Sequence, residues 1–236
     1  MPVQKPRGRK RMSHKRLYAS IIVLTLLVFS SIAYAYISWF APSATASSCP
    51  APPAATDGNA YACIYTSKGY FEVELFTQSA PKTVANFINL AESGFYDNLV
   101  WHRISTSNPS DVQVIQTGDP LTRNGGGDRS DWGTGGSNQT VPLEVSNSSL
   151  HNYRGYLGMA RGASNNSGTS QFYINTQNNL GLDGRYTVFG RVVSGMGVVD
   201  ALAAVQTYGP DGQYPEEQPV DPSQAMLLKI VILTSS

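Results

Sequence analysis

Hydrophobic and polar residues alternate along several short stretches of this 236-residue chain. In one of them Val73 and Leu75 alternate with Glu72 and Glu74, which predicts a strand with one solvated face and one core face. A second apolar run precedes it across Ser-Lys-Gly, which predicts a β-hairpin. The strands predicted in this way are 62–66, 70–76, 99–104, 112–116, 171–174, 186–190 and 226–233. The last one is apolar at nearly every position, which predicts burial on both faces.

Two stretches have the spacing of helices. Residues 81–91 place apolar side chains at i, i+3, i+4 and i+7 behind an initial proline, which suits the first turn of a helix. Residues 195–206 repeat this pattern. Residues 122–140 are rich in glycine but carry no phosphate-binding motif, so we expect a surface loop there. Many short strands with two helices favour a closed or sandwiched antiparallel sheet.

The N-terminal part of the chain differs in character from the rest. Its first 16 residues carry seven of the 17 Lys and Arg and no acid, and the next 24 residues carry no charge. A helix needs about 20 apolar residues to cross a bilayer, and basic residues before it predict a cytoplasmic N-terminus. We therefore predict a cytoplasmic tail (1–16), a transmembrane signal anchor in the cell membrane (17–40), a Pro/Ala/Ser-rich linker (41–60) and an extracytoplasmic domain (61–236). Cleavage of a signal peptide near 33–35, followed by secretion, is the alternative.

The composition of the remaining chain argues against several classes of function. It has ten Lys and Arg against sixteen Asp and Glu, and an acidic domain argues against nucleic-acid binding. Its histidines lack metal-ligand spacing and no serine lies in a Gly-x-Ser-x-Gly elbow, so we expect neither a metal site nor a hydrolase. Cys49 and Cys63 allow two interpretations: a disulfide in an exported domain, or one cysteine in the linker and one in a strand.

Six blocks of sequence, in order, make the chain resemble the cyclophilin family of peptidyl-prolyl cis–trans isomerases, most closely its prokaryotic branch. The blocks are Phe71 to Phe76 with Ala80 to Phe87, His102 to Ile104, Gln116 to Pro120, Gly158 to Arg161, Ser170 to Ile174, and Leu182 to Gly190. The resemblance implies a mainly β fold, a closed eight-stranded antiparallel β-barrel capped by two helices. The transmembrane helix predicted from residues 17–40 precedes this domain. It also implies an enzyme that needs no cofactor and acts on proline-containing polypeptides.

The resemblance assigns roles to single residues as well. It implies that Arg103 is the catalytic group, which hydrogen-bonds the twisted prolyl amide, and that Gln116 orients it. It implies that Gln171 and the backbone near Arg161 hold the peptide. The residues that it places at the proline pocket or its rim are Gln113, Val114, Met159, Tyr173, Leu182 and Tyr186.

Two positions depart from the family's pattern. Gln113 stands where the family usually has a phenylalanine in the pocket floor, so either Val112 or an aromatic residue from elsewhere fills the space, or the pocket is shallower. Gly181 stands where well-studied eukaryotic members carry a tryptophan that supports cyclosporin binding, so weak cyclosporin binding is expected. We predict a prolyl isomerase that assists the folding of exported proteins. The alternative is a non-catalytic peptide-binding or chaperone module with a degenerate pocket, and Gln113 is the residue that favours it.

Overall fold

The computed structural model describes residues 49, 58–106, 111–209, 212–215 and 217–233. The predicted basic tail, the predicted transmembrane span and most of the linker lie outside these residues. Within the part of the chain that is described, no helix is both long and apolar enough to cross a membrane.

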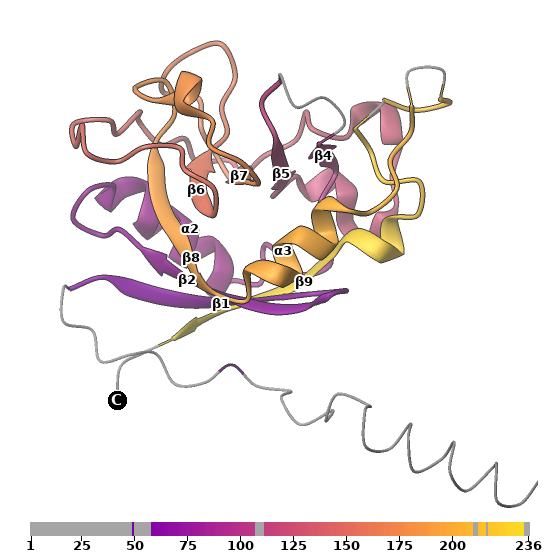
Figure 1. Ribbon diagram of the computed structural model, residues 1–236, viewed down its shortest axis with the longest axis horizontal. Helices are drawn as coiled ribbons and strands as arrows, with labels where there is room; N and C mark the ends of the chain where they lie inside the picture. The colour runs from indigo at the N-terminus through magenta and orange to yellow at the C-terminus, as the bar shows by residue number, and fades with distance from the viewer. Residues whose placement is uncertain (1–48, 50–57, 107–110, 210–211, 216, 234–236) are drawn as a thin grey trace, which may run out of the picture. The chain divides into compact units, whose positions relative to one another are not determined.

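The described strands form one antiparallel sheet. In Figure 1, β1, β2 and β9 run along the lower side of the domain and β4 to β7 lie above them. The order across the sheet is β3-β9-β1-β2-β8-β6-β7-β5-β4. The strands are β1 (Ala60–Thr66), β2 (Gly69–Leu75), β3 (Leu99–Val100), β4 (Arg103–Ser105), β5 (Val114–Thr117), β6 (Tyr156–Met159), β7 (Phe172–Asn175), β8 (Val188–Ser194) and β9 (Met226–Leu233).

The two ends of this sheet belong to one short segment of chain. Only Trp101 and His102 separate β3 from β4, and the Thr117 hydroxyl of β5 donates to the Val100 carbonyl of β3 over 2.9 Å. The predicted single strand at 99–104 is therefore interrupted, because its first half pairs with β9 and its second half with β5. For this reason the described sheet has nine strands rather than the expected eight. It curls back on itself through this segment, and the described pairings include no ladder between β3 and β4.

An aromatic cluster lies in the core of the curled sheet, and two helices pack against the sheet. The helices are α2 (Pro81–Glu92) and α3 (Met196–Ala203), so the first prediction is right to one residue, whereas the second helix is shorter than expected. The ring of Phe87 on α2 lies 5.3 Å from that of Phe172 and 5.5 Å from that of Phe189, measured between ring centroids. Helix α3 lies against β2, β4 and β5. Aromatic rings at these distances stabilise the core beyond the effect of burying their apolar surface.

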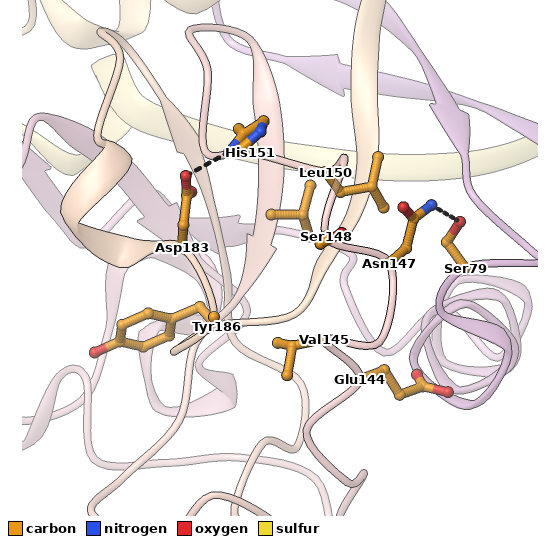
Figure 2. Close-up of a pocket in the computed structure, with 11 residues that line it drawn as sticks. Ser79, Glu144, Val145, Asn147, Ser148, Leu150, His151, Asp183 and Tyr186 are labelled. Atoms are coloured by element: carbon orange, nitrogen blue, oxygen red, sulfur yellow. Dashed lines mark hydrogen bonds and ion pairs between the residues drawn. The ribbon is translucent and has the colours of Figure 1, made fainter.

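The N-terminus of α2 is capped by a distant carboxylate. Ala80 precedes the helix and provides no side-chain cap. Instead, Glu144 accepts hydrogen bonds from the backbone N–H of Lys82 at 3.1 Å and from the N–H and hydroxyl of Thr83 at 2.9 and 2.8 Å. Figure 2 shows the Glu144 side chain turned toward a helix and away from the other labelled residues. A carboxylate there satisfies orphan donors and complements the helix dipole.

The outer face of β2 corrects one expectation. Glu72 and Glu74 were predicted to be solvated, but both are buried. Glu74 accepts from Arg191 Nε at 2.7 Å and from Asn59 Nδ2 at 2.8 Å. Glu72 lies opposite Cys63 in the register of β1 and β2, and Cys63 forms a disulfide with Cys49. Cross-strand partners share one face of a sheet, so the disulfide lies on the same face as Glu72.

The last strand corrects another expectation. β9 was predicted to be buried on both faces, but Leu228 and Val231 are 41% and 37% exposed, while Leu227 and Ile230 are buried. An apolar run alone does not distinguish a strand buried on one face from a strand buried on both.

We expect Glu144→Ala to destabilise the domain by about 1–2 kcal/mol, because it removes the N-terminal cap of α2. Urea unfolding followed by circular dichroism measures the difference. The control is Glu92→Ala, an exposed glutamate at the other end of the same helix, which should change stability by less than about 0.5 kcal/mol. Equal stability of the Glu144 variant and the native protein would contradict the capping role.

Candidate active site

A row of side chains crosses four neighbouring strands on the outer face of the sheet. Arg103 of β4 lies opposite Gln116 of β5, Gln116 opposite Tyr173 of β7, and Tyr173 opposite Gly158 of β6. Cross-strand partners point to the same face, so these side chains share one surface. The sheet thereby brings together three of the residues that the resemblance implicated.

The neighbouring row points inward and belongs to the core. Ile104, Ile115, Ile174 and Leu157 are cross-strand partners in the same strands, and each is at most 2% exposed. Because successive side chains of a strand alternate between faces, burial of this row forces the row of Arg103 outward. The core thus sets the orientation of the candidate site.

Gln171 links this row to the glycine-rich loop. Its amide nitrogen donates to the carbonyls of Gly133 and Gly135 at 2.9 and 2.7 Å. Its amide oxygen accepts from Gln116 Nε2 at 2.8 Å. The two carbonyls decide which end of the Gln171 amide is the donor, so its oxygen must face Gln116. The resemblance implied that Gln116 orients Arg103, but in the structure the amide of Gln116 is engaged with Gln171.

The same loop is held from its other side by a buried carboxylate. Asp119 is fully buried and accepts from the N–H groups of Leu121, Gly133 and Gly135 at 2.8, 2.5 and 3.2 Å. A side chain at position 135 would place its Cβ 2.2 Å from Asp119 Oδ1, so the approach requires glycine. The segment expected to be only a surface loop therefore forms a fixed wall of the site.

The Arg103 guanidinium is paired with Glu217. Its Nε donates to Glu217 Oε2 and its Nη2 lies 3.4 Å from Oε1, so both oxygens of the carboxylate face it. The Arg103 and Glu217 side chains are 39% and 33% exposed. Residues 208–222 showed only a proline-rich loop in the sequence, and nothing in that pattern indicated that this loop reaches Arg103.

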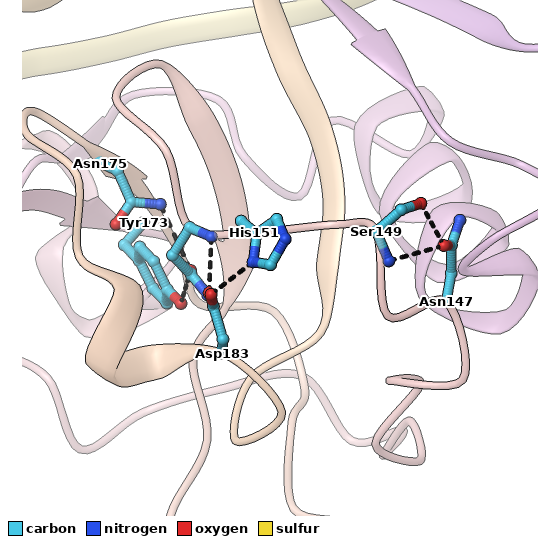
Figure 3. A network of polar contacts seen from close by, with 7 residues as sticks. Asn147, Ser149, His151, Tyr173, Asn175 and Asp183 are labelled. Atoms are coloured by element: carbon cyan, nitrogen blue, oxygen red, sulfur yellow. Dashed lines mark hydrogen bonds and ion pairs between the residues drawn. The ribbon is translucent and has the colours of Figure 1, made fainter.

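A chain of hydrogen-bonded polar groups lies behind Tyr173 (Figure 3). The Tyr173 hydroxyl donates to Asn152 Oδ1 at 2.8 Å, and Asn152 donates to Asp183 Oδ1 through its N–H at 2.8 Å and its Nδ2 at 3.0 Å. Asp183 Oδ2 lies 2.7 Å from His151 Nδ1. Partial burial alone would raise the pKa of Asp183, but hydrogen bonds from Asn152 and His151 lower it overall. Burial raises the pKa of the Tyr173 phenol, which stays protonated as a donor.

The main chain of Gln113 is held by a second amide. Asn179 accepts from the Gln113 N–H at 3.2 Å and donates to the Gln113 carbonyl at 2.9 Å. Asn179 also donates to Asn175 Oδ1 at 2.7 Å, which connects it to the polar chain behind Tyr173. Gln113, which replaces the usual phenylalanine, is thus fixed through its backbone rather than through an apolar side chain.

Arg161 and Tyr186 each line one of two hollows. The first, of about 410 Å³, is lined by Gln116, Gln171, Arg161 and the glycine-rich loop. The second, of about 310 Å³, is lined by Tyr186, His151 and Asp183 (Figure 2). The Arg161 guanidinium stacks 4.9 Å from the centroid of the Tyr186 ring, which lies edge-on to Tyr173 at 5.9 Å. The stacked pair therefore forms a ridge between the hollows.

The remaining predicted pocket residues divide into two groups. Leu182 is half-buried at the end of a short 3₁₀ helix (Leu180–Leu182), and Val114 is buried on the outer face, opposite Ser105 and Asn175. Met159 follows Gly158 on β6, so it points to the inner face and belongs to the core cluster. The structure does not bring the side chain of Met159 to the site.

His102 is adjacent to Arg103 but buried. Burial lowers the pKa of its imidazole to about 4, against the opposing effect of the nearby Asp119 carboxylate. The ring is therefore neutral at pH 7 and is not available as an acid. Among the described residues, no group of three His, Cys, Asp or Glu side chains could hold a metal ion.

Comparison with known proteins identifies relatives along most of the chain. The family model described as "Cyclophilin type peptidyl-prolyl cis-trans isomerase/CLD" matches residues 61–225. The chain is 39% identical over 166 residues to peptidyl-prolyl cis-trans isomerase-like 1 of Aspergillus niger, which covers 70% of this chain and 91% of that protein. It is 33% identical over 225 residues to peptidyl-prolyl cis-trans isomerase A of Dickeya dadantii, which covers 92% of this chain and all of that protein.

A solved structure has the same fold. The crystal structure of a cyclophilin type peptidyl-prolyl cis-trans isomerase of Cryptosporidium parvum superposes with a TM-score of 0.62 and 27% sequence identity, covering 75% of this chain and 99% of that one. The same protein has been solved in the presence of the dipeptide Ala-Pro.

Proposed function

The chain belongs to the cyclophilin family of peptidyl-prolyl cis–trans isomerase enzymes, and from that premise we propose that Arg103 catalyses the isomerisation of X-Pro bonds in exported polypeptides. The observation that carries the proposal is the outer row of Arg103, Gln116 and Tyr173, which the core sets in one surface. The row presents a guanidinium, an amide and an aromatic ring beside a hollow that could hold a peptide chain.

These three groups suit the isomerisation of an X-Pro bond, a rotation in which no covalent bond breaks. The barrier to rotation about a peptide bond is about 18–20 kcal/mol, because the amide is stabilised by resonance. In the twisted transition state that resonance is lost and the prolyl nitrogen regains a lone pair. A guanidinium that donates to the twisted amide binds this state better than either planar state, which lowers the barrier.

The groups around Arg103 hold the substrate in this proposal. Gln171 and the backbone of Ala160 and Arg161 line the larger hollow, where an extended peptide can lie against them. The proline ring lies against the edge of Tyr173 and Leu182. Because Tyr173 and Val114 are 4% and 1% exposed, the pocket that they offer is shallow.

We expect Arg103→Ala to lower kcat/KM for a short X-Pro peptide by about 10²-fold, because one transition-state donor is lost. Arg103→Lys should be nearly as slow, since an ammonium lacks the planar fork of donors. NMR exchange spectroscopy of the peptide with the full chain measures the rate. Arg154→Ala, which removes an exposed arginine paired with Asp200, is the matched control and should keep full activity.

Either of two outcomes would contradict this proposal. An unchanged rate in the Arg103 variants would exclude the guanidinium from the chemistry. A native protein that folds and binds prolyl peptides without accelerating their isomerisation would favour the non-catalytic peptide-binding module.

We also propose that the domain is anchored outside the cytoplasm by residues 17–40. The uncharged run behind a basic segment supports this placement. The disulfide between Cys49 and Cys63 supports it independently, because disulfides persist in oxidising compartments. The enzyme would then act on exported polypeptides as they fold near the membrane.

We expect a reporter enzyme that is active only outside the cytoplasm to be active when it is fused to the C-terminus of the full chain. The fusion should also remain in the membrane fraction after alkaline carbonate washing. An inactive reporter would contradict export. An active reporter that is released in soluble form would favour cleavage of a signal peptide and secretion.

The native protein should bind cyclosporin weakly, and Gly181→Trp should increase the affinity by at least about tenfold, or about 1.4 kcal/mol. A Cβ added at Gly181 would meet no atom within 4 Å, so the backbone there accepts a side chain without a clash at its first carbon. Calorimetric titration measures the change. Gly197→Trp, at a second position with open space, is the control and should leave the affinity unchanged. Equal affinities of the Gly181 variant and the native protein would contradict the attribution of weak cyclosporin binding to Gly181.

A further inference from the structure

The proposed catalytic arginine has an internal carboxylate partner, and any role of that partner in the reaction rests on the proposed function of Arg103. Glu217 contacts the Nε edge of the guanidinium with both of its oxygens. Nε and Nη2 are engaged in this way, while Nη1 has no hydrogen bond to a described residue. The carboxylate therefore occupies one edge of the fork and leaves the other edge for a ligand.

The backbone places Glu217 beside Arg103. The Glu217 carbonyl accepts from the N–H of Ile104, the residue after Arg103, at 2.8 Å. The next residue is also held, since Gln218 donates to the Arg129 carbonyl through Nε2 at 2.8 Å and its own carbonyl accepts from the Tyr208 N–H at 3.0 Å. The segment that carries the carboxylate is thus tied to β4 on one side and to the loop of residues 126–133 on the other.

A cation–aromatic cluster anchors the same segment. The Arg129 guanidinium lies 4.7 Å from the ring centroid of Trp132, 5.2 Å from that of Tyr208 and 4.8 Å from that of Tyr214. Its Nη2 also donates to the Pro219 carbonyl. Such contacts stabilise the arrangement, and more strongly when they are shielded from water. Arg129 therefore contacts a described residue before Glu217, Tyr214, and one after it, Pro219.

No amide in the row performs the same task. Gln116, which the resemblance makes the partner of Arg103, donates to Gln171 instead. An arginine on a strand projects from the surface on a long side chain with many rotamers. Only some of these rotamers direct the guanidinium along the row. In the described chain, Glu217 is the carboxylate that pairs with this guanidinium.

We propose that Glu217 is a positioning residue for the reaction: it binds the Nε and Nη2 edge of Arg103 so that Nη1 faces the prolyl amide. A general contribution to stability is not its main effect, since ion pairs exposed to this degree stabilise a fold only weakly. Its effect is on the transition state, which depends on the direction of one donor.

The test compares Glu217→Gln, Glu217→Asp and the native full chain in the isomerisation assay, with kcat and KM determined separately. We expect Glu217→Gln to lower kcat by about 5- to 50-fold with KM changed less than twofold, because orientation in the transition state is lost while peptide binding remains. Glu217→Asp keeps the charge and should recover part of the rate. Glu92→Gln, which removes an exposed carboxylate far from the row, should match the native protein.

A readout independent of activity separates this inference from the proposed function. The Arg103 Nε–H resonance, assigned by its loss in Arg103→Lys, should shift in Glu217→Gln and not in Glu92→Gln. An inactive native protein in which this shift occurs would overturn the proposed function but not the pairing. An unchanged resonance would overturn the pairing.

Other results would also overturn the inference. An unchanged kcat in Glu217→Gln would show that Arg103 needs no partner. A higher kcat/KM would show that the carboxylate blocks the arginine rather than positions it. A lower melting temperature accompanied by native kcat at a permissive temperature would show a purely structural role.

Discussion

The alternation of side chains along β4, β5, β6 and β7 is the constraint on which the rest of the site depends. In each strand, one residue belongs to the buried row of Ile104, Ile115, Ile174 and Leu157, and its neighbour faces outward. A shift of register by one residue would exchange the two rows and expose the isoleucines. The free energy that holds the core together therefore also holds Arg103, Gln116 and Tyr173 on one surface.

The sheet supplies the floor of the site, and buried polar side chains hold its walls. Asp119 and Gln171 bind the glycine-rich loop from opposite sides, through its N–H groups and its carbonyls. Asn152 holds the segment around Asp183 by hydrogen bonds, and Asn179 holds the segment around Gln113. Buried amides and carboxylates are costly unless they are fully hydrogen-bonded, and these side chains have several partners each. Such loops are pre-organised without a large apolar core of their own.

Local patterns in the sequence predicted what depends on local periodicity, and little else. The spacing of Val84, Phe87 and Ala91 predicted α2. The six family blocks named Arg103, Gln116 and Tyr173, which the sheet places in one row. The same reasoning was wrong for Glu72 and Glu74, because a disulfide and Arg191 cover a face that the alternation marks as solvated. The sequence of β9 shows that the strand is apolar, but it does not show which of its two faces is covered by other parts of the protein. Contacts across more than 60 residues leave no local signal, and the cap of α2 by Glu144 is one of them.

The contact of Glu217 with Arg103 is another long-range contact without a local signal in the sequence. Its position explains why recognition of a family leaves part of a site undetermined. The six blocks identify the groups that face the substrate, but a long side chain such as Arg103 acts only in one orientation. That orientation depends on whatever lies beside it, here a carboxylate from a proline-rich loop 114 residues further along the chain. The loop itself is held by Arg129 among three aromatic rings, outside every block. The substrate-facing groups can therefore be read from a motif, whereas the groups that aim them have to be found in the fold.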